Sequence, residues 1–149
     1  MHNDTLKYLG NKTEQDIELL ESNLNIKITN DILRTYLLEL GAIVKNNKHT
    51  KEKLCGLTSL NNEYGLYKAT LSLHTFLNRY NLDSKNKLCL MLPINNTLGM
   101  YIYTDQKDTY GIRINKSKYI LKKFIPLENF LYKFIIEGKT LNRIVKKYL

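Results

Sequence analysis

The chain has 149 residues, 43% of them hydrophobic, which is enough for one domain with a core of its own. It contains no apolar run near the roughly 20 residues that cross a membrane, and its first residues lack the apolar segment of a secretory signal. The net charge is +9, and residues 111–149 hold 10 Lys and Arg against 2 Asp and Glu. Such a basic end suits an acidic partner, a phosphate backbone or an anionic surface, and a solvated lysine-rich face is the alternative.

The two cysteines, Cys55 and Cys89, each lie in an apolar, strand-like run. Two are too few for a disulfide framework, so we expect buried free thiols and a cytoplasmic location. No Cys-x-x-Cys or paired-histidine spacing indicates a metal site, and no motif indicates a cofactor.

The N-terminal part of the chain predicts two helices after a loose arm over residues 1–12. Thr13 can cap a helix over residues 14–23, since acidic residues follow it in the first turn. A second helix is predicted over residues 31–40, with its N-cap supplied by Thr29, Asn30 and Asp31, and Gly41 can end it in a left-handed conformation. Its apolar face is the stripe Leu33, Tyr36, Leu37 and Leu40.

Two short strands and a third helix are predicted next. The strands cover residues 42–44 and 54–60, with a polar loop over residues 45–53 between them. Asn61 or Asn62 can cap the third helix. Its helical stripe is Leu66, Ala69, Leu73, Phe76, Leu77 and Tyr80.

Three strands in succession, over residues 88–94, 98–104 and 110–115, predict an antiparallel meander at the centre of the fold. We expect helices on one of its faces, where the even-numbered positions would be buried. These positions are Leu90, Leu92, Met100, Ile102, Ile112 and Ile114. The other face would stay open and carry tyrosine and arginine, which are frequent interface anchors.

That open face and its rim form the predicted partner-binding site. Its residues are Tyr101, Tyr103, Asp105, Asp108, Tyr110 and Arg113. A sheet face covered by tyrosine rings or by the C-terminal helix is the alternative interpretation.

The C-terminal part predicts a basic link over residues 116–123 and a helix over residues 127–137, which begins after Pro126 and ends at Gly138. A basic helix over residues 139–149 completes the chain. Together the elements predict an α+β fold, with a single, mostly antiparallel β-sheet flanked by N- and C-terminal helices. We expect one domain over residues 1–149, with its core at about residues 13–137.

The sequence carries no catalytic constellation, so an enzyme is not expected. The three histidines share no spacing with one another or with a carboxylate, and the glycines are isolated. Nucleic-acid binding has some support, because Tyr101, Tyr103, Arg113 and Tyr119 place aromatic and cationic groups near one another. No run of residues matches the aromatic signature of an RRM domain, however.

Four segments resemble the SMI1/KNR4-like domain of the SUKH superfamily. The opening TEQDIELLESNLNIKITNDILRTYLLELGAI is similar to the family's two helices and the glycine turn after them. KLCGLTSL resembles its next strand, LCLMLPINNTLGMYIYTDQKDTYGIRIN its central hairpin region, and PLENFLYKFI its closing helix. The resemblance covers residues 13–136.

The resemblance implies a binding role rather than an enzymatic one. Bacterial domains of this family are mostly immunity proteins, which bind and neutralise a cognate polymorphic secreted toxin, often a nuclease. The expected partner is therefore a toxin protein. The alternatives are a nucleic-acid-binding module or a regulatory scaffold that uses the basic C-terminal region.

Overall fold

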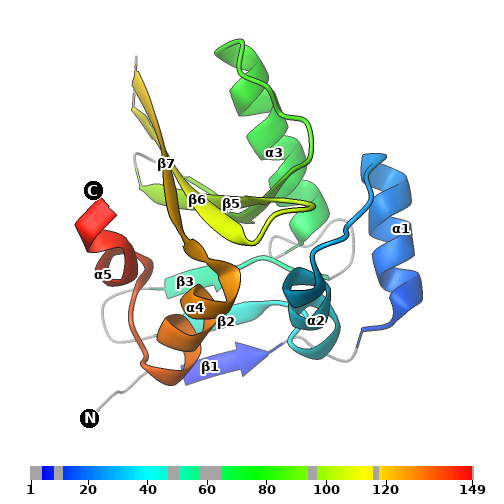
Figure 1. The fold of residues 1–149 in the computed structure, drawn as a ribbon, viewed down its shortest axis with the longest axis horizontal. Helices are drawn as coiled ribbons and strands as arrows, with labels where there is room; N and C mark the ends of the chain where they lie inside the picture. The colour runs from blue at the N-terminus through cyan, green and yellow to red at the C-terminus, as the bar shows by residue number, and fades with distance from the viewer. Residues whose placement is uncertain are drawn as a thin grey trace.

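The structure is a computed structural model that describes residues 5–8, 12–46, 51–57, 65–93, 97–115 and 118–148. The fold is α+β, as predicted, but its strands form two antiparallel sheets rather than one (Figure 1). The small sheet has the order β1 (Thr5–Tyr8), β2 (Ile43–Asn46), β3 (Lys51–Leu54). The large sheet has the order β4 (Lys87–Met91), β5 (Leu98–Tyr103), β6 (Asp108–Asn115), β7 (Lys118–Pro126).

Helices occupy the predicted stretches of the chain, except that Gly65, and not Asn61 or Asn62, is the N-cap of the third helix. The longer ones are α1 (Glu14–Leu24), α2 (Asp31–Glu39) and α3 (Leu66–Arg79). The C-terminal part contains α4 (Leu127–Leu131), the π-helical turn η1 (Tyr132–Ile136), α5 (Leu141–Val145) and the 3-10 turn η2 (Lys146–Tyr148). Within the described ranges no helix combines the length and the apolar character needed to cross a membrane.

The ends of the first two helices form as the sequence predicts. The Thr13 backbone N–H donates to the Asp16 carboxylate at 2.8 Å, and the Asn30 side chain accepts from the Leu33 N–H at 3.1 Å. Gly41 follows α2 with a φ of 72°, a left-handed conformation that glycine adopts without steric cost. Local capping residues therefore fix where α1 and α2 begin and where α2 stops.

Three strand predictions were wrong. β1 forms within the predicted loose arm, β3 begins inside the predicted polar loop, and β7 replaces the predicted basic link. These segments are rich in lysine and lack strict apolar alternation, so pairing with a neighbouring strand decides their structure rather than their own pattern. Of the strand predicted over residues 54–60, Leu54 ends β3, and residues 58–60 lie outside the described residues.

The large sheet is covered on both faces. All five residues of β4 are buried. On one face, α3 runs from β4, where Thr70 Oγ1 accepts from the Cys89 N–H at 3.0 Å, to β7, where the rings of Tyr80 and Tyr119 are 5.4 Å apart. On the other face η2 packs against β7. The expectation of an open face on the meander was therefore wrong.

The register between β5 and β6 also differs from the prediction. Tyr101 lies opposite Tyr110, and Leu98 lies opposite Arg113, so odd-numbered positions of β5 share a face with even-numbered positions of β6. The turn between the strands sets this phase, and the sequence pattern alone does not. Ile112 consequently lies on the face of Tyr101, while Arg113 lies on the opposite face.

The predicted buried positions are mostly confirmed despite this change of face. Leu90, Met100, Ile102 and Ile112 are buried, Leu92 is half-buried, and the side chain of Ile114 lies outside the described residues.

Candidate functional site

The structure brings three of the predicted site residues together as a tyrosine cluster. The rings of Tyr101 and Tyr110 stack with centroids 5.4 Å apart, and Tyr103 meets both rings edge-on at 5.8 and 5.2 Å. Lys87 Nζ lies 5.7 Å from the Tyr101 ring. Only 3% of Tyr101 is exposed, and burial raises the pKa of its phenol. Tyr101 is therefore a core residue, and its large side chain is not available to anchor a partner.

The other predicted site residues do not extend this cluster into one surface. Asp108 forms an ion pair with Lys123 at 3.1 Å, and Asp105 is exposed at the turn after β5. Arg113 lies on the far side of the sheet, opposite Leu98. Its Nε is buried and has no hydrogen-bond partner among the described residues. Partner binding by the half-buried Tyr103 and Tyr110 stays a prediction.

A basic surface forms where the C-terminal turn packs on the large sheet. The Phe124 ring occupies the space above Gly111, where a Cβ would come within 1.9 Å of it, and it packs against Tyr148 at 6.0 Å. Because Lys122 is paired with Gly111 and precedes Phe124 by two residues, it shares their face of the sheet. The contact between Phe124 and Tyr148 thus places the C-terminal turn on the face that carries Lys122.

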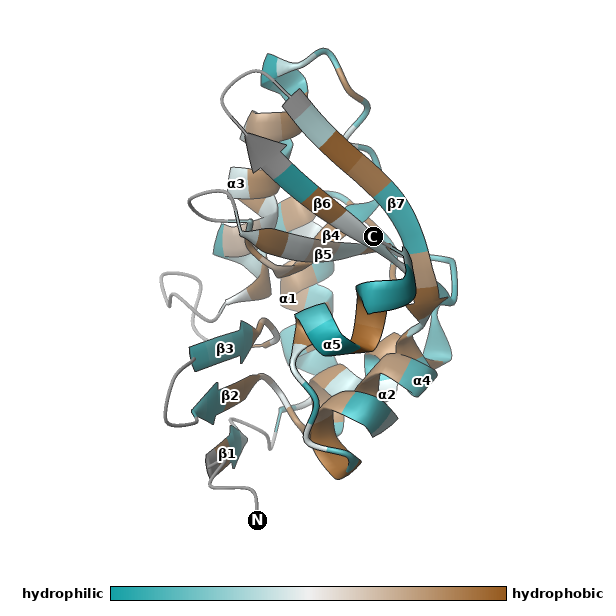
Figure 2. Ribbon diagram, turned by 90° about the vertical axis from the view of Figure 1, so that its left-hand side faces the viewer, coloured by the Kyte–Doolittle hydropathy of each residue, from teal (hydrophilic) through white to brown (hydrophobic). Residues whose placement is uncertain are grey.

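We call this surface the C-terminal basic face. It consists of four exposed cations: Lys122, Arg143, Lys146 and Lys147. None of the four forms an ion pair with a carboxylate in the part of the chain that the structure describes. Figure 2 shows α5 and the C-terminus beside β7, with hydrophilic residues prominent on α5. Arg113 shares the sheet face of Lys122.

The sequence predicted the charge of this surface but not its composition. The excess of lysine and arginine after residue 111 was visible, and the basic helix at residues 139–149 forms as α5 and η2. Lys122 could not be assigned to the same surface, because that requires the pairing of β6 with β7 and the contact of Tyr148 with Phe124.

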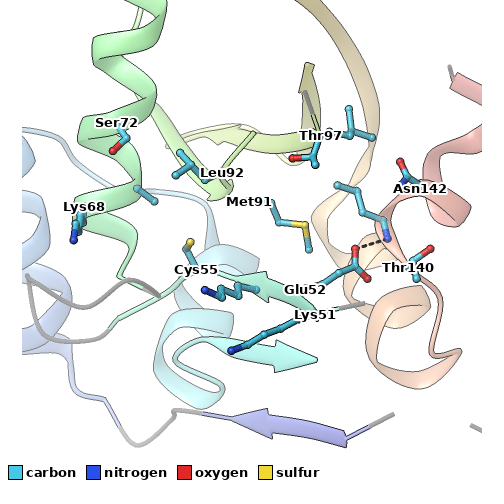
Figure 3. Close-up of a pocket in the computed structure, with 14 residues that line it drawn as sticks. Lys51, Glu52, Cys55, Lys68, Ser72, Met91, Leu92, Thr97, Thr140 and Asn142 are labelled. Carbon is cyan, nitrogen blue, oxygen red and sulfur yellow. Dashed lines mark hydrogen bonds between the residues drawn. The ribbon is translucent and has the colours of Figure 1, made fainter. Parts of the chain in front are cut away.

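A cleft of about 640 Å³ lies next to this surface, between the two sheets. Four parts of the chain line it: β3, the first half of α3, the region where β4 ends and β5 begins, and the start of α5 (Figure 3). Glu52 Oε2 accepts from the Leu141 N–H at 3.0 Å and so joins two of these walls. Leu98 lies in the cleft and is paired with Arg113, and α5 continues from the cleft to Arg143.

Three kinds of group could carry chemistry here: metal-ligand clusters, the cysteine in the cleft and the histidine of α3. The described residues contain no group of three His, Cys, Asp or Glu side chains that could hold a metal ion. Cys55 lines the cleft, but burial raises the pKa of its thiol to about 12, so the thiol stays protonated at neutral pH. His74 Nε2 lies 2.8 Å from the Lys87 carbonyl oxygen, as expected for a hydrogen-bonded histidine at the edge of the core.

Comparisons with known proteins found no relative of this chain. The chain matches no protein-family model, no curated protein and no solved structure.

Proposed function

We propose that this chain is a non-catalytic binding protein that neutralises an acidic partner protein, and that the C-terminal basic face is its contact surface. The observation that carries the proposal is a group of four exposed cations on β7 and on the C-terminal segment that packs against it, none of them paired with a carboxylate of the described residues. Complementary charge across an interface accelerates association and discriminates against basic partners. Arg143 follows Asn142, which lines the cleft, and arginine is a residue type that is common among interface anchors.

The proposed partner is a cognate secreted toxin, most simply a nuclease domain with an acidic surface. This part of the proposal is supported by the resemblance of residues 13–136 to immunity proteins of the SMI1/KNR4-like type. In that role the protein would act in the cytoplasm of the cell that carries it, by covering the toxin's active site or the path to it.

Binding of single-stranded nucleic acid has less support, because it uses exposed aromatic rings on which bases stack. On the sheet face of Lys122 the exposed apolar side chain is Ile120, at 47% exposure. Tyr148 is half-buried against Phe124, and Tyr119 lies on the opposite face. Among the described residues, the basic face thus provides cations without a stacking platform.

The decisive experiment reverses two charges of the basic face. We expect Lys146→Glu with Lys147→Glu to slow association with the proposed toxin domain by about tenfold or more, and to weaken the salt dependence of that association. Stopped-flow fluorescence at low and physiological ionic strength measures both. The matched control is Lys27→Glu with Lys85→Glu, which makes the same change of net charge at two exposed lysines elsewhere.

Two outcomes would contradict the proposal. Equal association rates for the two double variants would remove the basic face from the interface. Tight binding of a labelled DNA duplex that only the Lys146→Glu, Lys147→Glu variant loses, with no binding of the toxin domain, would assign the face to nucleic acid.

A further inference from the structure

The cleft between the two sheets has the size and the lining of a small-molecule site. Its volume of about 640 Å³ falls within the roughly 300–1,000 Å³ that such sites occupy. Its walls come from elements far apart in the sequence, and the hydrogen bond from the Leu141 N–H to Glu52 holds two of them in place. The cleft is therefore a built feature of the tertiary structure.

Apolar side chains form most of the inner surface. Met91, Leu141 and Cys55 are buried, so their positions are fixed by the core behind them. The Cys55 thiol belongs to this apolar surface because it stays protonated. The apolar lining residues are Cys55, Ala69, Met91, Leu92, Leu98 and Leu141. A surface of this kind can bury a hydrocarbon chain or a ring.

Cationic and neutral polar groups surround the apolar part. Three of the four charged lining residues are lysines, and the fourth, Glu52, accepts the Leu141 N–H. Lys68 is exposed on α3 and has no ion pair with the described residues. Ser72 and Asn142 stand on opposite walls and can donate hydrogen bonds.

We propose that the cleft binds a small amphiphilic anion, with its apolar body against Met91, Leu98 and Leu141 and its anionic head beside Lys68. The expected class is a carboxylate or sulfonate attached to an aliphatic chain or an aromatic ring. This site is independent of the C-terminal basic face, because no residue of that face lines the cleft. Its occupation would bridge the small sheet, α3 and α5, and so stabilise the fold.

Calorimetric titration of the full chain with dodecanoate tests the proposal, with anilinonaphthalene sulfonate as a fluorescent second probe. We expect one saturable site for each anion, and a rise in the unfolding temperature when it is filled. Dodecyltrimethylammonium, which has the same chain and a cationic head, should bind at least about tenfold more weakly.

Two cleft-filling variants locate the site. Ser72→Trp and Asn142→Trp place a large ring on opposite walls, and each should lower the affinity for both anions by about tenfold or more. Asn78→Trp is the matched control, since it is also exposed on α3 but does not line the cleft. The chain has no tryptophan of its own, so each variant also reports its local fold by its single fluorescence signal. Lys68→Glu should weaken the binding of dodecanoate without affecting the binding of neutral dodecanol. Lys85→Glu should change the affinity for neither.

The proposal is overturned if neither anion binds the unmodified chain, or if both cleft-filling variants bind as tightly as the control. Equal affinity for the cationic and anionic amphiphiles would remove the anion preference. If dodecanoate does not bind and a bound toxin domain protects the cleft, the apolar surface of the cleft binds a side chain of the partner and not a small anion. None of these results bears on the charge-reversal experiment at the basic face.

Discussion

At the scale of single residues, buried polar groups connect segments that the sequence places far apart. The Tyr36 hydroxyl lies 3.0 Å from the Leu54 carbonyl oxygen and 2.9 Å from that of Cys55, so it joins α2 to the end of β3. The sequence predicted Tyr36 as part of an apolar helix stripe, and it is indeed buried. The acceptors of its hydroxyl could not be predicted, because they follow from the packing of α2 on the small sheet.

Cys55 gives a prediction of pH dependence. Burial raises the pKa of its thiol from 9.0 to about 12 and also raises that of Cys89, so the native state holds these protons where the unfolded chain releases them. Well below pH 9.0 the thiols are protonated in both states, and their ionisation does not affect stability. From there towards pH 12 we expect stability to fall, by about 1.4 kcal/mol per pH unit for each thiol at the steepest.

Urea unfolding across this alkaline range measures the slope. Cys55→Ala should lower stability at neutral pH and make the alkaline slope shallower than in the unmodified chain. An unchanged slope in that variant would show that Cys55 ionises equally easily in the native and unfolded states.

At the scale of elements, the helices were predictable and the strand phase was not. The helical stripes of α2 and α3 and the caps at Thr13 and Asn30 are local signals, so they survive in the fold. Phase between strands depends on turn geometry and on bulges, such as the irregularity between Cys89 and Met91. For that reason Arg113 was predicted on the wrong face although its strand was placed correctly.

Leu37 tests the packing of α2. It is fully buried in the middle of the helix stripe, so Leu37→Ala should lower the free energy of unfolding by about 2–5 kcal/mol. Leu19 on α1 is 54% exposed, and Leu19→Ala should change it by no more than about 0.5 kcal/mol. Equilibrium denaturation in urea compares the two. A loss of less than about 1 kcal/mol for Leu37→Ala would mean that α2 is peripheral to the core.

At the scale of the whole molecule, the candidate sites depend on contacts between distant parts of the chain. The cleft forms only where β3, α3, the β4–β5 region and α5 come together, and no sequence motif predicts that arrangement. The basic face needs η2 to pack on β7. Composition could therefore predict an anionic partner, while the location of its binding surface had to come from tertiary structure.

Lys45 is the clearest link between the small sheet and the C-terminal segment. It is 2% exposed, and its Nζ donates to the Phe134 carbonyl at 3.0 Å and to the Lys139 carbonyl at 2.8 Å. The same nitrogen lies 4.3 Å from the centre of the Phe134 ring. One side chain of β2 thus donates hydrogen bonds to a carbonyl group of η1 and to one just after it. It thereby holds the segment that leads to the cleft and the basic face.

Lys45→Met keeps the length of the side chain and removes its three N–H donors. The two carbonyl groups lose their ammonium donor, which costs about 1–3 kcal/mol for each buried group left unsatisfied, while the loss of a buried charge offsets part of that cost. We expect a net loss of stability of about 1–3 kcal/mol. Hydrogen exchange should rise first in β2 and residues 134–139. Lys7→Met, at an exposed lysine of β1, is the control and should change little. If Lys45→Met were as stable as the control, apolar packing would hold the C-terminal segment on the small sheet, and the hydrogen bonds of Lys45 would contribute no net stability.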